Sequence, residues 1–445
     1  MKVLSLFDGM ACGMLAMKNA GIEVERYVAF EIDKYAVQTS SHNFPNIEHR
    51  GDVFKANFSE FVGFDFLIGG SPCTYWSIAQ KNNRETEASG MGWELFSQYV
   101  RALREARPKF FIYENNKSMA KAIRESITET FGFEPICINS ALVSAQNRQR
   151  LYWVGKRNPD GTYSRVHVDQ PEDRCILLKD VLDGLCWKEQ VDMVAQPVGI
   201  GYRGRMEDGK WVKRYESNEE PKSNALTTCL TDSMTAVPVS VRCRGRDGVG
   251  GKWEARSDGK NGVVTANTVG VNIAVPVRVG AMPRPNGELS TSQAFRVYSS
   301  DGKSVNITAG GGGAGGKTGL YAIPVEFDGD IPIKAVSGLD GKTYSVYEVK
   351  DGQITIKGKQ YPIKLVDGYY IIRKLTVNEC KRLQTVPEWY EFPVSNAQAY
   401  KMLGNGWTVE VIAHLIASTQ SNTRTVENKP STPNETEQMS IFYLV

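Results

Sequence analysis

Apolar and polar positions alternate in blocks along the first 157 residues, and the blocks have the lengths of short buried strands and amphipathic helices. The stretch 93–107 (WELFSQYVRALREAR) has apolar residues on one helical face and ends at Pro108, and a second helix is expected over about residues 117–131. Strands are expected at 3–7 (VLSLF), 26–33 (RYVAFEID), 64–70 (FDFLIGG) and 109–115 (KFFIYEN), and near PICINSALV and RLYWVGK. This order of elements predicts an α/β fold with a doubly wound, mostly parallel sheet and helices on both faces.

The pattern changes near residue 190, where glycines become frequent and no long helical pattern remains. Three related units follow, each with a Lys-Ser/Asn-x-x-apolar-Thr element (KSNALT at 222, KNGVVT at 260 and KSVNIT at 303) and a closing AVPV or AIPV. We interpret them as three β-rich modules at about 197–239, 238–277 and 276–325. A repetitive scaffold without a ligand is the alternative interpretation.

Charge in this glycine-rich segment favours a partner that carries phosphates. Over residues 191–325, Lys and Arg outnumber Asp and Glu, and RGR at 203–205 and 244–246 sets arginines among glycines. Glycine neighbours let the backbone come close to a nucleic-acid strand. The candidate contacts are Arg203, Arg205, Arg244 and Arg246.

The rest of the chain is expected to close this insertion and return to the first domain. Alternation with turn glycines predicts hairpins over 340–371, so the insertion would span 186–371. Helical periodicity returns at 375–384 and 408–418, which indicates that 372–418 rejoins the domain formed by 1–185. Residues 419–445 are polar and are predicted to be disordered.

Composition narrows the class of protein. The 445 residues carry a net charge of +3, with 41% hydrophobic and 23% charged residues, which is typical of a globular protein. No signal peptide or long apolar run is recognisable, so a cytoplasmic protein without a membrane span is expected. The eight cysteines lack CxxC spacing and there are only 4 histidines, so we expect neither a metal site nor disulfides, and most cysteines are expected to be small core residues.

The first strand leads into a turn that could bind a nucleotide-like ligand. The sequence FDGMACG (7–13) places glycines between a strand and a helix, where the backbone can approach such a ligand. Glu31 ends the next strand, where an acid can bind ribose hydroxyls, and Asp52 ends a possible further strand. Such turns also occur without a ligand, so this turn alone leaves ligand binding open.

A cysteine follows the third predicted strand. Cys73, in GGSPCTYWS (69–77), lies behind a Gly-Gly-Ser-Pro turn, and a thiol on such a loop becomes a nucleophile when its pKa is lowered or a partner is near. Glu114 ends the next strand and would lie at the same edge of the sheet. A thiol and an acid that converge there suit attack on a heteroaromatic ring with protonation of a ring nitrogen. The absence of a nearby histidine disfavours a Cys-His hydrolase.

A third polar cluster, QNRQR (146–150), begins another strand of the same domain. Charged side chains along a strand usually form a solvated edge. Beside a reactive site they could instead hold the phosphates of a substrate.

Taken together and in order, these motifs resemble those of the DNA (cytosine-5) methyltransferases, which use S-adenosylmethionine. The matching stretches are the FDGMACG turn, the SPC loop, the EN pair, QNRQR, RKLTVNECKRLQTVPEWY (373–390) and GNGWTVEVI (404–412). They cover about 1–157 and 372–418, and the segment between them is where the family has its target-recognition domain. The compact chain is most similar to bacterial or phage members, some of which belong to restriction-modification systems.

The resemblance implies a mechanism and a role for each matching residue. A cytosine would be flipped out of the duplex, Cys73 would attack carbon 6, Glu114 would protonate N3, and carbon 5 would take the methyl group. Arg148 would support the flipped base, and Arg150 a neighbouring phosphate or loop. The cofactor pocket would be lined by Phe7, Asp8, Gly9, Gly13, Glu31, Ile32, Asp52, Val53, Pro72 and Asn405. Double-stranded DNA would be contacted by the four arginines named above and by Ser71, Trp76, Asn82, Asn83, Arg84, Asn115 and Gln146, with the loop 74–92 closing over it.

Two positions depart from the family pattern. Asn116 is the third residue of ENN, where the family usually has valine, and DGMACG lacks the common FxGxGG form. Both positions border the chemistry, so activity is expected to survive.

Two other functions compete with this one. A tRNA cytosine-5 methyltransferase would share the motifs, but the large segment 186–371 argues against it. A catalytically silent DNA-binding regulator is disfavoured because Cys73, Glu114, Arg148 and Arg150 are all retained. The enzyme is expected to act as a monomer.

The polar tail ends in EQMSIFYLV. Residues Gln438–Phe442 (QMSIF) resemble the pentapeptide by which bacterial proteins bind the replication sliding clamp, so a clamp is a predicted partner. A terminal strand packed on the protein's own surface is the alternative.

Overall fold

The computed structural model describes residues 1–77, 84–183, 199–207, 210–217, 234–235, 241–244, 252–255, 274–290, 292–307, 319–325, 335–337 and 342–424, with the backbone alone at Cys73, within 199–255, at 335–337 and at 421–424. Two compact units are present, one formed by Met1–Asp183 with Val275–Val445 and the other by Gly184–Ala274.

The first unit is built around a sheet with strand order β3-β2-β1-β4-β5-β7-β6. The first five strands of this order are parallel, and β7 runs antiparallel to both β5 and β6. The predicted α/β fold with a mostly parallel sheet is therefore confirmed. The strands are β1 (Lys2–Leu6), β2 (Arg26–Phe30), β3 (Glu48–His49), β4 (Phe66–Gly69), β5 (Phe110–Asn116), β6 (Ile136–Asn139), β7 (Gln149–Arg157) and β8 (Tyr163–Arg165), which pairs with β7.

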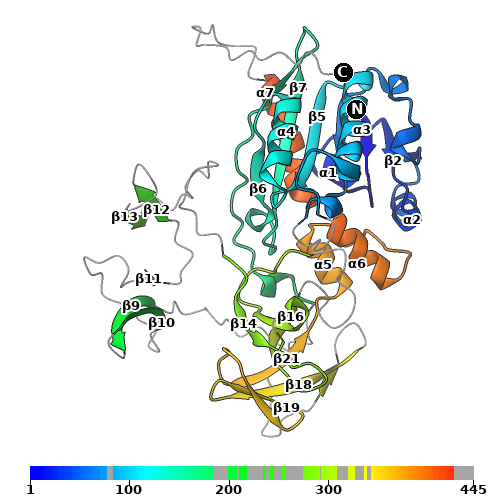
Figure 1. Cartoon of the computed structure of the whole chain (residues 1–445). Coiled ribbons are helices and arrows are strands. Elements are labelled where there is room, and N and C mark those ends of the chain that lie inside the picture. The colour runs from blue at the N-terminus through cyan, green and yellow to red at the C-terminus, as the bar shows by residue number, and fades with distance from the viewer. Residues whose placement is uncertain are drawn as a thin grey trace. The chain divides into compact units, whose positions relative to one another are not determined.

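Helices cover both faces of this sheet. On one face, Phe96 and Tyr99 of α3 and Ile123 of α4 share a buried core with strand residues such as Leu67 and Phe111. On the other face, α1 approaches β4 and packs against α7, so the C-terminal helix returns to the N-terminal half, where Figure 1 shows it in orange-red among blue and cyan elements. The helices are α1 (Cys12–Asn19), α2 (Lys34–Asn43), α3 (Gly90–Ala106), α4 (Lys121–Phe131), α5 (Val377–Leu383), α6 (Asn396–Asn405) and α7 (Val409–Arg424).

Three features of these helices differ from the expectation. Helices α2 and α6 were not predicted, because α2 is largely polar and the buried apolar residues of α6, from Ala399 to Leu403, span little more than one turn. Helix α7 continues to Arg424, whereas residues from 419 onward were predicted to form a disordered tail.

A second sheet in the same unit has the order β14-β15-β16-β21-β18-β19-β20, with β17 paired to β18. Strands β15 and β16 are parallel and the other pairs are antiparallel. Its core contains Val279, Val297, Ile354, Tyr361 and Ile363. The strands are β14 (Arg278–Ala281), β15 (Arg296–Ser299), β16 (Leu320–Val325), β17 (Ala335–Ser337), β18 (Thr343–Lys350), β19 (Gln353–Ile356), β20 (Lys359–Pro362) and β21 (Gly368–Arg373).

In the second unit the structure describes only strands. Strands β9 (Gly199–Glu207), β10 (Lys210–Ser217) and β11 (Met234–Thr235) form one sheet, and β12 (Val241–Arg244) pairs with β13 (Lys252–Ala255). The elements KSNALT and KNGVVT and the pentapeptide Gln438–Phe442 lie outside the described residues. The three-module division and the predicted domain limits stay predictions. No helix in the described part of the chain is long and apolar enough to span a bilayer.

Candidate active site

The predicted site residues follow neighbouring strands at one edge of the first sheet. Leu6 of β1 is in register with Gly69 of β4, which is in register with Tyr113 of β5. Strands β1 and β4 therefore end at the same level, and β5 continues past it to Asn116, so that Glu114 lies one residue beyond this level. This register brings together the turn after β1, the loop that carries Cys73, and Glu114.

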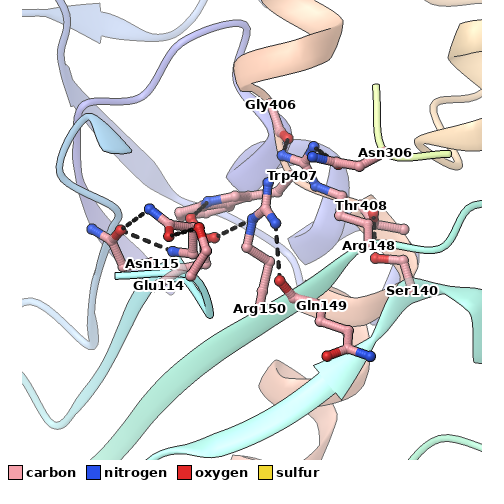
Figure 2. Close-up of polar contacts among 12 residues, drawn as sticks. Glu114, Asn115, Ser140, Arg148, Gln149, Arg150, Asn306, Gly406, Trp407 and Thr408 are labelled. Atoms are coloured by element: carbon pink, nitrogen blue, oxygen red, sulfur yellow. Dashed lines mark hydrogen bonds and ion pairs between the residues drawn. The ribbon is translucent and has the colours of Figure 1, made fainter. Parts of the chain in front are cut away.

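Glu114 is an acid of this edge whose two carboxylate oxygens are both bound. Its side chain is buried, with 8% of the residue exposed, and each carboxylate oxygen has a partner. The Oε1 atom lies 3.0 Å from Nε of Arg150, and Oε2 accepts a hydrogen bond of 2.9 Å from Nε1 of Trp407. Figure 2 shows Arg150 and Trp407 converging on the carboxylate from different segments. Because a guanidinium and an indole can only donate, the carboxylate is held in place by two donors.

Gly70 makes this approach possible. A Cβ atom at Gly70 would lie 2.8 Å from Oε2 of Glu114 and 2.9 Å from its carbonyl oxygen. Such contacts are shorter than van der Waals distance, so a larger residue would displace the carboxylate. The second glycine of GGSPC is therefore required by the position of Glu114.

Hydrogen bonds hold the loop after Gly70 to β5. The hydroxyl groups of Ser71 and Tyr113 are 2.6 Å apart, and Nδ2 of Asn115 donates to the carbonyl oxygen of Ser71 at 3.2 Å. Ser71 and Asn115 are both buried, so they hold the loop from its interior side. Pro72 is exposed, and Cys73 begins a short 3-10 turn, Cys73–Tyr75.

Arg148 links three segments of the chain. Its Nη1 atom donates to Oδ1 of Asn306 at 2.8 Å and to the carbonyl oxygen of Ile307 at 3.2 Å. Its guanidinium also donates to the carbonyl oxygens of Gly404 at 3.3 Å and Gly406 at 2.8 Å, which lie at the C-terminal end of α6. A cation at a helix C-terminus pairs with carbonyls that have no partner in the helix. Arg148 therefore fixes the turn that carries Trp407.

The predicted cofactor turn has an unusual backbone. Phe7, Gly9 and Ala11 have φ values of 57°, 59° and 60°, a left-handed conformation that is rare for residues other than glycine. Glu31 holds this turn in place: Oε2 accepts from the amide of Gly9, and Oε1 from the amide of Ile32, both at 2.8 Å. The turn is open at Gly9, because a Cβ atom added there would have no neighbouring atom within 4 Å among the described residues.

Asp8 was predicted to line the cofactor pocket, but its carboxyl group lies beneath the turn. Its Oδ1 accepts hydrogen bonds of 2.6 Å from the hydroxyls of Ser5 and Tyr27. The other oxygen, Oδ2, is buried with no hydrogen-bond partner among the described residues. Burial raises the pKa of Asp8 from 3.8 to about 6, against the two hydroxyl donors, which lower it.

The other predicted cofactor residues surround the turn in different ways. Ile32 is 77% exposed at the mouth of the turn, whereas Val53 is buried. Asp52 caps a 3-10 turn by accepting from the amide of Phe54 at 3.0 Å. Gly13 is needed for close packing, because a Cβ there would lie 2.3 Å from Cδ1 of Ile68. Asn405 is exposed at the end of α6.

The loop predicted to close over DNA is anchored by a buried tryptophan. Trp76, predicted to contact DNA, is fully buried and donates from Nε1 to Glu85 at 3.0 Å. Glu85 also accepts from the amide of Gly92, and Arg84 donates to the carbonyl oxygens of Trp76 and Ser118. A large aromatic ring gains more by packing in the core than on a solvated loop, so Trp76 supports the loop instead of facing outward.

The other residues that were predicted to contact DNA are buried, lie in strands of the second unit, or lie outside the described residues. Gln146 is buried, and both of its side-chain amide atoms are without a hydrogen-bond partner among the described residues. Arg203 and Arg205 lie in β9 and Arg244 in β12. Asn82, Asn83 and Arg246 lie outside the described residues.

A second cysteine and a metal ion are the alternative sources of chemistry at this edge. Cys12 lies in the turn but is buried, and burial raises the pKa of its thiol to about 12, so it is a poor nucleophile. Within the described residues, no group of three or more His, Cys, Asp or Glu side chains could hold a metal ion.

Trp407 and Asn306 are the contacts that sequence reasoning missed. Trp407 directly follows the GNG motif, and that neighbourhood could have pointed to it. Asn306 gave no such signal, because 158 positions of sequence separate it from Arg148.

The sheet order, with β7 antiparallel between β5 and β6, and the loops at its carboxyl edge define an α/β protein of the Rossmann-like methyltransferase class, with an additional β-rich part. A methyltransferase of Entamoeba histolytica, EhMeth, has the same fold, with a TM-score of 0.50 and 11% sequence identity over 95% of this chain and 98% of the other.

Sequence comparisons place the chain within this class. The family model of the C-5 cytosine-specific DNA methylases matches residues 1–421. The orphan methyltransferase M.SPRI of Bacillus phage SPR is 27% identical over 93% of this chain and 95% of its own length. The type II methyltransferase M.FnuDI of Fusobacterium nucleatum is 33% identical over 35% of this chain and 47% of its own. The chain belongs to the C-5 cytosine-specific DNA methylase family, and its activity is that of a DNA (cytosine-5) methyltransferase.

Proposed function

We propose that the enzyme transfers a methyl group from S-adenosylmethionine to carbon 5 of a flipped-out cytosine in duplex DNA, through a covalent bond between the cytosine and Cys73. The observation that carries the proposal is the buried Glu114 carboxylate, held by Arg150 and Trp407 and in contact with Gly70, three residues before Cys73. An acid and a thiol on adjacent strand ends are the groups that addition to a cytosine ring requires.

The residues of the chain divide the reaction between them. The Cys73 sulfur forms a bond to carbon 6 as its thiol proton passes to the Glu114 carboxylate and from there to N3, and the electron pair of the ring then resides at carbon 5. Carbon 5 takes the methyl group and afterwards loses its own proton to solvent water. The electrons of that C–H bond restore the ring as Cys73 leaves and N3 returns its proton. Arg150 and Trp407 keep the carboxylate in position during these steps.

The turn after β1 fits S-adenosylmethionine as the methyl donor. Gly9 leaves open space beside a backbone that Glu31 fixes, and Ile32 and Phe54 offer exposed apolar side chains near the ends of β2 and β3. Glu31 would bind the ribose hydroxyls, and the apolar side chains would cover the adenine ring. The bound cofactor supplies an electrophilic methyl group on a sulfonium.

The proposal can be tested by transfer of tritium from methyl-labelled S-adenosylmethionine to duplex DNA. Wild-type protein should label the DNA, Cys73→Ala should not, and Cys175→Ala is the matched control because Cys175 is an exposed cysteine outside the site. DNA that contains 5-fluorocytosine should trap the wild-type enzyme covalently, because fluorine cannot leave carbon 5 as a proton does. Trapping of the Cys73→Ala protein would contradict the assigned nucleophile.

Two outcomes would favour the competing functions. Label in tRNA and none in DNA would identify a tRNA methyltransferase. Cofactor and DNA binding without transfer to either substrate would identify a silent regulator.

A further inference from the structure

Lys303, in the third repeated element KSVNIT, is the starting point. Only 1% of this residue is exposed, and its ammonium donates to the carbonyl oxygens of Ala141 at 2.8 Å, Ser144 at 3.0 Å and Ile176. An ammonium group has three protons to donate, so these carbonyls satisfy it completely. A buried lysine that is fully bonded to another part of the chain fixes the two parts together.

The residues after Lys303 continue the contact toward Arg148. The amide of Ser304 donates to Ala145 at 2.7 Å, and the carbonyl of Ser304 accepts from the amide of Asn147 at 2.9 Å. These backbone bonds place Asn306 and Ile307 where both accept from the Arg148 guanidinium. The segment 303–307 therefore lies along 144–148 and ends at Arg148.

The three copies of the repeated element differ in an informative way. Lys303 and Ile307, which is buried, have counterparts of the same type in the other copies, namely Lys222 with Leu226 and Lys260 with Val264. The contacts of Ser304 are made by its backbone, which any residue provides. Asn306 is different: the corresponding residues are Ala225 and Val263, and neither side chain can accept a hydrogen bond from a guanidinium.

We propose that Lys303 and Ile307 are the docking pair of the repeated element, and that Asn306 specialises the third copy to position Arg148. The third copy is then a built-in part of the active site. It fixes Arg148, which fixes the carbonyls of Gly404 and Gly406, and these precede Trp407, the donor to Glu114. Lys303 and Asn306 are positioning residues that touch neither base nor cofactor. The proposal rests on the role of Glu114 proposed above.

The sharpest test exchanges residues between copies. Asn306→Val and Asn306→Ala give the third copy the side chain found in the second and first copies. We expect the single-turnover rate of methyl transfer to fall about tenfold or more, because small displacements of a catalytic group are costly. The dissociation constant for S-adenosylmethionine should change much less than this rate, because only Asn405 of the predicted cofactor residues lies in the turn that Arg148 holds, whereas Gly9 and Glu31 lie elsewhere.

Lys303→Met tests the docking pair itself. Hydrogen exchange of the Ser304 and Asn147 amides should become faster, because the bonds they make depend on the docked segment. The matched control is Lys179→Met, which removes an exposed ammonium, 3.9 Å from Asp301, elsewhere in the same contact region. This control should exchange and transfer methyl groups like the wild type. If Lys303→Met does not fold, Ile307→Ala, which truncates the other member of the pair, is measured in the same way and decides the question.

The outcomes separate the two proposals. Wild-type rates in both Asn306 variants would overturn the positioning role, and wild-type exchange in a folded Lys303→Met protein would overturn the docking pair. A wild-type enzyme that transfers no methyl group would overturn the proposed function, whereas the exchange experiment would still decide whether Lys303 docks the segment.

Discussion

At the scale of single residues, the geometry around Glu114 depends on two donors from opposite sides. Arg150 lies on β7, one strand away from Glu114 on β5, so sheet pairing already brings it near. Trp407 comes from the turn between α6 and α7, and nothing in the sheet dictates its position. The indole is therefore the donor that can be removed without disturbing the sheet.

Trp407→Phe should lower the rate of the chemical step by roughly tenfold to a hundredfold, because the ring is kept but the N–H donor to Oε2 is lost. Release of tritium from DNA labelled at carbon 5 of cytosine measures this step under single-turnover conditions. Trp389→Phe is the matched control, because Trp389 is 47% exposed and away from Glu114. An unchanged rate in Trp407→Phe, with DNA and cofactor binding also unchanged, would show that Arg150 alone suffices.

Asp8 makes a prediction about pH. Its pKa is raised by burial to about 6 in the folded protein, from an ordinary value of 3.8. The contribution of Asp8 to stability is therefore fully present below pH 3.8 and is lost as the pH rises through about 6. Between about pH 5 and about pH 7.5, the wild type should lose about 1 kcal/mol of unfolding free energy relative to Asp8→Asn, which cannot titrate.

Urea unfolding at the two pH values measures this difference. Asp160→Asn serves as the control: Thr162 donates to Asp160 and lowers its pKa, so its contribution is lost only when the pH falls below its ordinary range. The control should therefore behave like the wild type across the same interval. A wild type and Asp8→Asn that respond identically to pH would mean that Asp8 is not held as an acid beneath the turn.

At the scale of elements, the sequence pattern was sufficient where local periodicity and burial agree. The strands that precede Phe7 and Gly70, and the strand that contains Glu114, were predicted to within a few residues, because each begins with an apolar run. Helix α6 escaped prediction because its buried apolar residues span little more than one turn, although it ends at the turn that carries Trp407. The order of the strands and the antiparallel direction of β7 could not be predicted either. The antiparallel insertion of β7 between β5 and β6 is decided by tertiary pairing, and it is what brings Arg150 opposite Asn116, two residues from Glu114.

The candidate site was predictable to the same extent. Local motifs pointed to Glu114, near the end of β5, and to Arg148 and Arg150, at the start of β7. The burial of Trp76 and of the Asp8 carboxyl was not visible, because burial depends on what packs from elsewhere. Residues that act across long separations, such as Lys303 and Asn306, have no local signature beyond the repeat.

At the scale of the whole molecule, the site is assembled from segments that the insertion separates in sequence. Arg148 joins the first part of the chain to Asn306 and to Gly404 and Gly406, and α1 packs against α7. If the chain were cut within the insertion, only these non-covalent contacts would hold the two parts together. The C-terminal part must therefore dock on the N-terminal part before Glu114 acquires its second donor.

Beyond these segments, the tail 425–445 provides the last prediction. The pentapeptide Gln438–Phe442 has a glutamine, two aliphatic side chains and an aromatic residue in the order typical of short peptides that insert into a groove on a sliding clamp. Deletion of 438–445, or the double change Gln438→Ala with Phe442→Ala, should abolish pull-down by a bacterial clamp. Lys429→Ala, elsewhere in the tail, should leave it unchanged. Methylation of a short free duplex should be the same in all variants, because no clamp is present to raise the local concentration of the enzyme on DNA. Equal pull-down of the wild type and the double variant would mean that these side chains do not bind the clamp, and the terminal strand would then be the better interpretation.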